Sequence, residues 1–224
     1  MIISFANQKG GVGKSTHCAL FAQYLSDKQK TVHIIDMDFQ RSLVNKRAAD
    51  KSFSLAEKRE QDETLFDNSL NYTIEAVSPD NILPHIGKAR KNPELIYIID
   101  TPGSLANENV LKVLYASELI VVPFGYSEMK LDSTAVFIQL VKTFKIPSKL
   151  VFLPNDSDKR YKEANPDKIE GLKQINEILL RSGVIAPTVY HLADMQRFST
   201  LEMSSRQKEI LTPTYDFIYN VLFS

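Results

Sequence analysis

The stretch Gln8-Lys-Gly-Gly-Val-Gly-Lys-Ser-Thr16 is the strongest structural signal in this chain of 224 residues. The apolar run at 2–6 precedes it and predicts a short buried strand, and residues 15–27 after it predict a helix. Glycines let consecutive backbone N–H groups point into one concavity, and the helix N-terminus behind them adds partial positive charge. The stretch therefore predicts a loop that binds phosphate groups.

Each part of this loop has an expected role. Lys14 is placed to reach the β- and γ-phosphates of a nucleotide, the Ser15 hydroxyl to bind Mg²⁺, and the Thr16 hydroxyl to touch the α-phosphate. The backbone cradle is expected from Gly10, Gly11, Val12 and Gly13. The usual spacing, G-x-x-x-x-G-K-S/T, would require glycine where this chain has Gln8, and a second lysine, Lys9, precedes the glycine pair. A surface turn with two solvated lysines is the alternative, but the flanking strand and helix disfavour it.

The same alternation of apolar strand and helix recurs along the chain. We expect further strands at 31–36, 72–77, 95–100, 118–124, 149–154 and 184–186, and helices at 80–91, 107–116, 131–144, 167–181, 194–204 and 213–223. Near-continuous apolar strands indicate a sheet that is covered on both faces, and the alternation favours parallel strands with right-handed crossovers. The polar segment 41–71 is expected to form surface helices and loops. Residues 1–224 are thus predicted to form one α/β domain of three layers around a mostly parallel sheet.

Acidic residues stand at the ends of two predicted strands. Asp36 and Asp38 lie at positions i and i+2, so their side chains point the same way and can face one site. Asp100 ends another buried strand, where a carboxylate beside a phosphate loop can hold Mg²⁺, usually through water. Gly103, in the turn that follows, can offer its N–H to the γ-phosphate. Solvation, or capping of the next helix, is the alternative for the first two acids.

Composition limits the classes of function. The chain has 27 Lys+Arg and 27 Asp+Glu, and this zero net charge argues against holding nucleic acid by bulk charge, although local basic patches remain open. Its single cysteine, Cys18, excludes a disulfide within the chain and an all-thiolate metal site, and is expected to be a small buried side chain. The four histidines show no ligand spacing and are expected to be structural. No apolar run approaches the roughly 20 residues of a membrane helix.

The run Lys9-Gly-Gly-Val-Gly-Lys-Ser-Thr16 resembles the phosphate loop of the deviant Walker-A ATPases, the group of ParA, MinD and their relatives. The resemblance implies the P-loop NTPase fold, with ATP and Mg²⁺ as ligands. It also implies that Lys9 is the signature lysine, which reaches across a dimer interface to the nucleotide of the partner subunit. A cation supplied in this way would stabilise charge on the transferring phosphoryl group, as an arginine finger does.

The acidic stretches add to this resemblance. Residues 34–42 resemble the family motif D-x-D-P-Q, which implies that Asp38 orients the attacking water and that Asp36 supports the magnesium site. Phe39 replaces the usual proline, and Arg41 stands where a glycine is common.

The later strand ends extend the resemblance. Residues 96–103 resemble a Walker B strand followed by the start of switch II, which implies Mg²⁺ at Asp100 and a γ-phosphate contact at Gly103. Asn155 and Pro187 correspond to positions near the adenine in the family, although both are also common turn residues.

Three features of the chain favour a short ParA-type protein within this family. The phosphate loop begins at residue 8, which leaves no room for an N-terminal helix-turn-helix domain, and 212–224 lacks the lysines and arginines of a MinD-type membrane helix. The lone cysteine disfavours the relatives that need cysteine pairs. We therefore expect no membrane contact and a cytoplasmic, nucleoid-associated protein.

The resemblance implies an ATP-dependent homodimer that binds DNA non-specifically. A ParB-like centromere-binding partner would stimulate hydrolysis, and the cycle would segregate plasmid, chromosome or mobile-element DNA. Between 141 and 162 basic residues exceed acidic ones by four, and candidate DNA contacts are Lys142, Lys145, Lys149, Lys159, Arg160, Lys162, Arg197, Arg206 and Lys208. The alternatives are a switch that positions a protein cargo and a dethiobiotin-synthetase-like ligase.

Overall fold

The computed structural model describes residues 1–58, 72–155, 157, 166–191, 195 and 197–224. Its strands form one parallel seven-stranded sheet in the order β3-β2-β4-β1-β5-β6-β7. The strands are β1 Ile2–Phe5, β2 Val32–Asp36, β3 Tyr72–Ala76, β4 Ile96–Asp100, β5 Leu119–Phe124, β6 Lys149–Pro154 and β7 Val184–Ile185. All seven strands expected from the sequence are present, with ends that differ by at most one residue.

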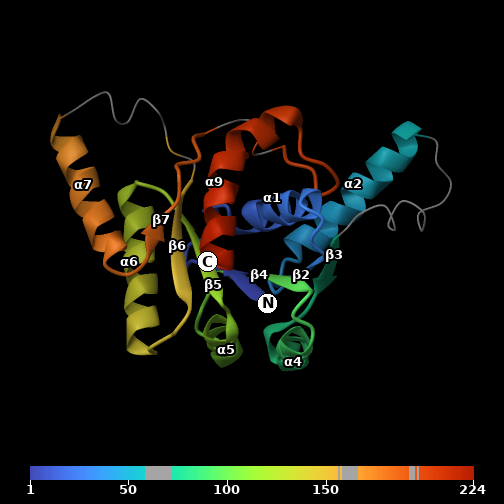
Figure 1. Cartoon of the computed structure of the whole chain (residues 1–224), viewed down its shortest axis with the longest axis horizontal. Helices are drawn as coiled ribbons and strands as arrows, with labels where there is room; N and C mark the ends of the chain where they lie inside the picture. Colours follow the sequence, from blue (N-terminus) through green and yellow to red (C-terminus); the bar gives the residue numbers. More distant parts are fainter. Residues whose placement is uncertain (59–71, 156, 158–165, 192–194, 196) are drawn as a thin grey trace.

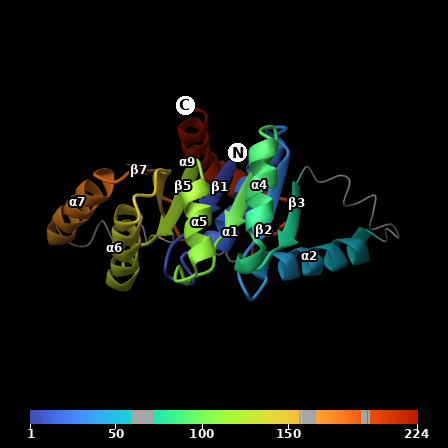
Figure 2. The same cartoon turned by 90° about the horizontal axis from the view of Figure 1, so that it is seen from below.

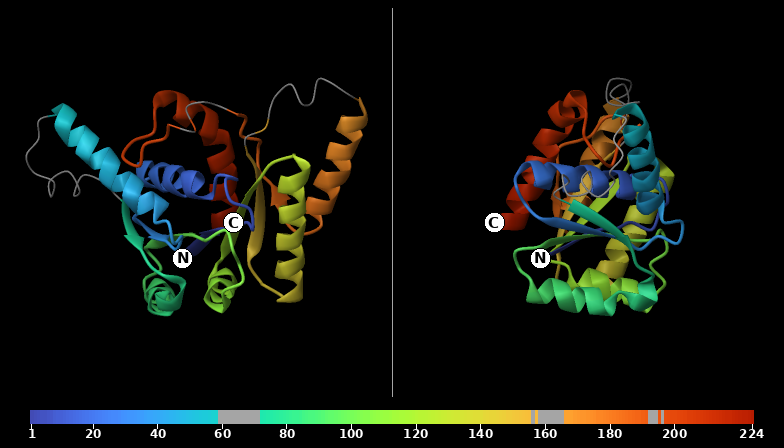
Figure 3. Two further views of the ribbon diagram at one scale, coloured as in Figure 1. Left: turned by 180° about the vertical axis from the view of Figure 1, so that it is seen from behind. Right: turned by 90° about the vertical axis from the view of Figure 1, so that its right-hand side faces the viewer.

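Helices cover both faces of this sheet (Figures 1 and 3). Helices α1 and α9 pack on one face, and α4, α5 and α6 pack on the other. The described helices are α1 Lys14–Asp27, α2 Ser42–Lys58, α4 Leu83–Lys91, α5 Glu108–Ala116, α6 Glu128–Thr143, α7 Pro166–Leu180 and α9 Ser205–Phe223, with a 3-10 turn η1 Pro79–Asn81. Figure 2 shows α4 and α5 side by side across the sheet. The predicted three-layer α/β architecture is therefore confirmed, and it is that of a P-loop NTPase.

The two apolar cores explain why the central strands of the sheet are apolar on both faces. In β2, Ile34 belongs to the core under α1 and α9, whereas its neighbour Ile35 belongs to the core under α4 and α5. Successive strand residues point to opposite faces, so a sheet covered on both sides needs apolar residues at every position. Both side chains are fully buried.

The C-terminal region differs from the expectation. Helix α9 begins at Ser205, not at 213, and residues 197–204, the fully described part of the predicted helix 194–204, contain no helix. A capping box starts α9: the Ser204 hydroxyl accepts from the backbone N–H of Gln207, whose side chain accepts from the N–H of Ser204. Pro213 then lies inside the helix, where a proline causes a kink, and Figure 1 shows α9 bending along its length.

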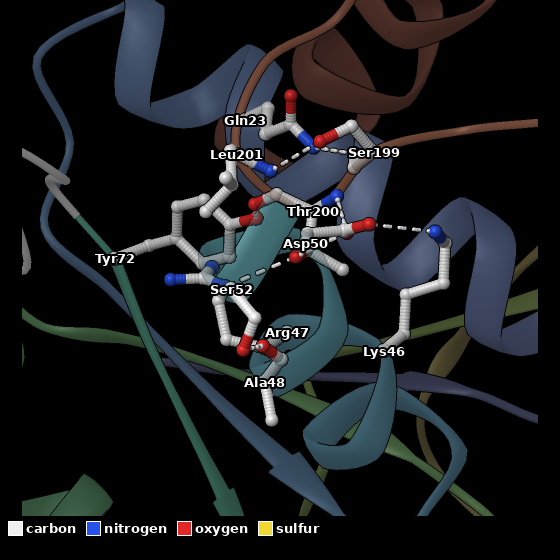
Figure 4. Close-up of polar contacts among 10 residues, drawn as sticks. All are labelled: Gln23, Lys46, Arg47, Ala48, Asp50, Ser52, Tyr72, Ser199, Thr200 and Leu201. Carbon is white, nitrogen blue, oxygen red and sulfur yellow. Dashed lines mark hydrogen bonds and ion pairs between the residues drawn. The ribbon is translucent and has the colours of Figure 1, made fainter. Parts of the chain in front are cut away.

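A buried polar network ties the segment before α9 to α2 (Figure 4). The Asp50 carboxylate accepts hydrogen bonds from the backbone N–H of Thr200 at 2.7 Å and from its hydroxyl at 2.8 Å, and forms an ion pair with Lys46 at 2.8 Å. Arg47 donates to the Thr200 hydroxyl at 3.2 Å, and its guanidinium lies 4.4 Å from the ring centre of Tyr72. These contacts fix the polar helix α2 to the body of the protein. The rest of the predicted surface segment, 59–71, lies outside the described residues.

None of the described helices combines the length and the apolar character that crossing a membrane requires.

The order of the strands indicates which end of the sheet carries the ligand site. Strand β2 lies two places to one side of β1, and β5 lies directly on the other. Ligands in such sheets bind beyond the carboxyl ends of the strands where the order reverses, which here is the end of β1.

Candidate functional site

The loop between β1 and α1 has the backbone shape that the glycine-rich stretch predicts. Gly11 and Gly13 have φ angles of 74° and 100°, in the left-handed region that favours glycine. A side chain at position 13 would also collide with Asn155, because a Cβ there would lie 2.3 Å from its amide nitrogen. Gly13 caps α1 and supplies no side-chain hydrogen bond. The N-terminal N–H groups of α1 are therefore not satisfied by a capping side chain and are available to a ligand.

Lys14 lies at the start of α1 with its side chain largely buried. Its ammonium group donates to the backbone carbonyl of Lys9 at 3.2 Å, so it is held over the loop. Burial lowers the pKa of Lys14, whereas the nearby carboxylates of Asp100 and Asp38 raise it. The lysine is thus a buried cation that faces acidic groups across the loop.

Asp100 ends β4 directly beside both β1 and β2. In register it pairs with Phe5 on one side and with Asp36 on the other. The carboxylate is fully buried, and neither oxygen has a hydrogen-bond partner among the described residues. Burial raises the pKa of Asp100 to about 7, although the nearby Ser15 hydroxyl and Lys14 lower it.

A buried carboxylate that accepts no hydrogen bond from the described part of the chain, and that lies beside a serine hydroxyl, fits a magnesium ion. Mg²⁺ prefers oxygen ligands and binds through one or two carboxylates together with phosphate oxygens and water. Asp100 and Ser15 supply such oxygens next to the phosphate loop. An unpartnered buried carboxylate is costly unless a cation or a proton compensates it.

The phosphate loop borders a cavity of about 590 Å³. Its volume lies in the range of small-molecule sites, roughly 300–1,000 Å³. Four stretches line it: the phosphate loop, the segment after β2, the start of the 3-10 turn η1 after β3, and the loop after β4. The lining residues are Gly10, Gly11, Gly13, Lys14, Ser15, Thr16, Asp38, Phe39, Gln40, Ser42, Pro79, Pro102, Gly103, Ser104 and Asn107. The structure therefore brings Lys14, Asp38 and Gly103 together around one cavity.

Residues 3–205 match the family described as the CobQ/CobB/MinD/ParA nucleotide binding domain. The chain belongs to this family. The match covers the cavity lining and, apart from Ile2, all residues of the sheet strands, so the family's nucleotide-binding character applies to the region described above. A comparison with curated protein sequences finds no match.

Solved structures share the fold of this CobQ/CobB/MinD/ParA-family protein over nearly its whole length. Apo McdA from Cyanothece has a TM-score of 0.68 at 15% identity, covering 99% of this chain and 98% of that one. A putative plasmid partition protein from Borrelia burgdorferi, bound to AMPPNP, has a TM-score of 0.62 at 20% identity, covering 99% and 97%. MinD in the MinC:MinD complex of Aquifex aeolicus has a TM-score of 0.68 at 15% identity, covering 98% and 96%. At these identities the similarity shows the fold.

In this family member, the Asp36 carboxylate accepts hydrogen bonds from backbone N–H groups. One of its carboxylate oxygens accepts from the N–H groups of Leu43 and Val44 at 2.9 and 3.3 Å, and the other accepts from the N–H of Asp38 at 3.2 Å. The side chain therefore secures the start of α2, which is the capping alternative, and it does not line the cavity. A magnesium role for Asp36 stays a prediction.

The loop that carries Asp38 makes a tight turn. The Asp38 carboxylate accepts from the N–H of Gln40 at 2.9 Å, and the Asp38 carbonyl accepts from the N–H of Arg41 at 2.9 Å. Arg41 has a φ of 50°, which explains why glycine suits this position in the family pattern. Phe39, in place of the usual proline, is 79% exposed at the cavity wall.

Lys9 and the two residues expected near adenine stand outside the cavity lining. Lys9 is half-buried, and its backbone N–H donates to the Asn7 side chain at 3.3 Å. Asn155 donates to the carbonyl of Val12 at 2.9 Å and so supports the phosphate loop from β6. Pro187 is exposed, and its carbonyl accepts from the hydroxyl of Thr214 on α9 at 3.1 Å. The adenine roles stay predictions.

Sequence reasoning did not identify Asn7 as part of the site. This side chain is fully buried and donates to the carbonyl of Pro123 at 2.9 Å and to the hydroxyl of Thr134 at 3.1 Å. It thereby positions the backbone of Lys9 from the far side of the loop. The sequence offered one signal for Asn7: it is a polar residue between the apolar strand β1 and the glycines. Cys18 is buried as expected, and burial raises its thiol pKa.

Proposed function

We propose that this chain is an ATPase of the ParA type, which dimerises when it binds ATP and Mg²⁺. The observation that carries the proposal is that Lys14, Asp38 and Gly103 line the same cavity, next to an Asp100 carboxylate that has no hydrogen-bond partner among the described residues. A phosphate loop with its lysine, and a serine and an aspartate that can hold Mg²⁺, are parts that phosphoryl-transfer sites use.

Ser15 and Asp100 would hold the magnesium ion in this proposal. When bound, Mg²⁺ supplies positive charge that neutralises the phosphate oxygens of ATP. Lys14 adds a further cation from the protein, and the left-handed glycines point backbone N–H groups toward the phosphates. Asp38, whose carboxylate faces the same cavity, would accept a hydrogen bond from the attacking water and orient it.

Gly103 would make the loop after β4 responsive to the nucleotide. Its N–H would bind the γ-phosphate of ATP and lose that partner after hydrolysis, which is the usual way in which a nucleotide orders a switch loop. A Cβ at position 103 would come 3.8 Å from the backbone nitrogen of Gly10, so this loop already lies against the phosphate loop. The two loops are therefore close enough to sense the same phosphate.

The role of Lys9 separates this proposal from an ordinary phosphate-loop enzyme. Lys9→Ala should leave most of the ATP affinity intact and abolish the ATP-dependent dimer, because its ammonium would act on the partner subunit's nucleotide. Lys14→Ala is the matched control and should lose tight ATP–Mg²⁺ binding. Size-exclusion chromatography with light scattering, in a non-hydrolysable ATP analogue, measures the dimer. A Lys9→Ala protein that dimerises like the wild type would refute the proposal.

The ATP-bound dimer is further proposed to bind DNA non-specifically on the nucleoid and to release it when a ParB-like centromere-binding protein stimulates hydrolysis. The plasmid partition protein among the structural neighbours supports this choice. Two candidate contacts are engaged within the chain: Lys149 donates to the Val221 carbonyl at 3.1 Å, and Lys208 pairs with Asp27 at 2.8 Å. Lys142 and Lys145 are exposed near the end of α6 and are the better candidates. Lys159, Arg160 and Lys162 lie outside the described residues.

A second candidate function is the positioning of a protein cargo. The MinC:MinD complex among the structural neighbours favours it, because there a protein of the same fold is bound to a protein partner. Both candidates share the nucleotide-driven dimer and differ only in what the dimer binds. DNA binding that depends on ATP would distinguish them.

A further inference from the structure

We propose that His33, Glu75 and His85 form a binding site for a transition-metal dication of the Zn²⁺ class. The three residues come from different elements, β2, β3 and α4. Their ligand atoms all lie within 4.8 Å of one another. The Glu75 Oε2 atom lies 3.2 Å from His33 Nε2 and 3.8 Å from His85 Nδ1. Their positions in the sequence follow no ligand pattern, so the expectation that these histidines are merely structural did not anticipate this cluster.

The spacing of these atoms suits a tetrahedral ion. Zinc binds histidine nitrogen and carboxylate oxygen at about 2.0–2.1 Å, which puts neighbouring ligand atoms of a tetrahedron roughly 3.4 Å apart. The two contacts of Glu75, at 3.2 and 3.8 Å, fall on either side of that separation. Movements of a few tenths of an ångström would bring both contacts to it. Two histidines and one carboxylate, with water in the fourth position, are an established zinc ligand set.

The surroundings hold the His33 ring in the orientation that a metal ligand needs. Its Nδ1 atom lies 2.6 Å from the hydroxyl of Thr73, and the ring packs edge-on against Tyr97, with ring centres 5.3 Å apart. When Nδ1–H donates to the hydroxyl, the lone pair of Nε2 is left to face Glu75. Metal-bound histidines almost always donate their other ring nitrogen in this way.

The exposure of the three side chains is also compatible with a metal site. The histidine side chains are 18% and 14% exposed, whereas Glu75 is 50% exposed, so the cluster has a protein wall and an opening to solvent.

The site is separate from the nucleotide cavity, because none of its three residues lines that cavity. It joins β3, the edge strand of the sheet, to α4 on the covering layer. An ion bound there would cross-link three elements that otherwise meet through side-chain packing. Imidazole ligands favour zinc, copper or nickel over magnesium, so the site would not compete for the ion that accompanies ATP.

Calorimetric titration of the full-length protein with Zn²⁺, in excess Mg²⁺ and without nucleotide, tests the proposal. Magnesium, which prefers oxygen ligands, would occupy the proposed site around Asp100 and would leave histidine sites open. We expect one Zn²⁺ per chain, with affinity at least ~10-fold weaker in His85→Gln, since even residues behind the ligands change metal affinity by ~10–100-fold. His191→Gln, an exposed histidine beyond the opposite edge of the sheet, is the matched control and should bind like the wild type.

Glu75→Gln provides a second variant that keeps the side-chain volume, and circular dichroism establishes that each variant is folded. Glu75→Gln should weaken Zn²⁺ binding as His85→Gln does. Absence of Zn²⁺ binding to the wild type, or binding that neither variant weakens, would overturn the proposal. These results are independent of ATP binding, so they leave the proposed function untouched.

Discussion

At the scale of single residues, Asp100 holds a carboxyl group inside the protein with no hydrogen-bond partner among the described residues. Burial raises its pKa to about 7, so the folded state binds a proton more tightly than the unfolded chain. Between the unfolded pKa, about 3.9, and about 7, the folded protein therefore carries more protons at this group. The free energy of unfolding consequently falls as the pH rises through this window.

Asp100→Asn removes this titration. Relative to wild type, we expect the variant to gain stability at alkaline pH by roughly 2–4 kcal/mol, with little gain near pH 4. Urea unfolding of both proteins in a chelator, without nucleotide, at about pH 5 and about pH 8 measures the difference. The same pH dependence in both proteins would show that Asp100 is not the responsible group. The variant should also lose magnesium-dependent ATP binding.

Gly13 is the second residue whose role the local geometry defines. Gly13→Ala would place a side chain at a φ of 100° and 2.3 Å from the Asn155 amide, so we expect a loss of about 1–3 kcal/mol in the free energy of unfolding. Gly10→Ala is the control, because a Cβ there meets nothing within 4 Å. Urea unfolding without nucleotide compares the two. Equal losses would contradict the steric explanation.

The sequence was informative about site residues where a motif sits at a strand end. Lys14, Asp38 and Gly103 could be placed together because parallel strands bring their carboxyl ends to one edge. Pro79 and Asn107 also line the cavity, but they begin a 3-10 turn and cap a helix, which gives them ordinary reasons to occur in a sequence. Only the fold shows that these positions face the same space.

At the scale of elements, α9 shows what decides a helix start. A proline suits the first turn of a helix, so Pro213 predicted a start there, yet the capping box at Ser204 starts the helix at Ser205, eight residues earlier. The Ser-x-x-Gln spacing was present in the sequence as a signal. Burial of Leu211 and Tyr215 in the core beneath α9 outweighs the unfavourable proline between them. The strands were easier to predict, because apolar runs covered on both faces have few alternatives.

Ser204→Ala tests the cap directly. Loss of the hydroxyl that accepts from the N–H of Gln207 should cost about 1 kcal/mol of stability. Ser205→Ala, at the exposed first position inside the helix, is the matched control and should change stability by less than ~0.5 kcal/mol. Thermal or urea unfolding of the two variants provides the comparison. A larger effect at 205 than at 204 would place the helix start elsewhere.

At the scale of the whole molecule, the zero net charge bears on how DNA binding would be controlled. A strongly basic monomer would hold DNA at all times through its phosphate contacts. A chain without net charge needs a local basic site for DNA, and the proposed ATP-dependent dimer would double any such site. Zero net charge argues against DNA binding by bulk charge. It is compatible with the proposed switch, in which a local site on the dimer binds DNA.

DNA binding measured with ATP, with ADP and without nucleotide, over a series of salt concentrations, tests the proposed function most directly. We predict binding to non-specific duplex DNA only with ATP, with an affinity that falls steeply as salt increases because lysine and arginine contacts release counterions. Lys9→Ala, which should bind ATP without dimerising, should show none of this binding. Equal DNA affinity in all three nucleotide states, or no binding with ATP even at low salt, would contradict the account.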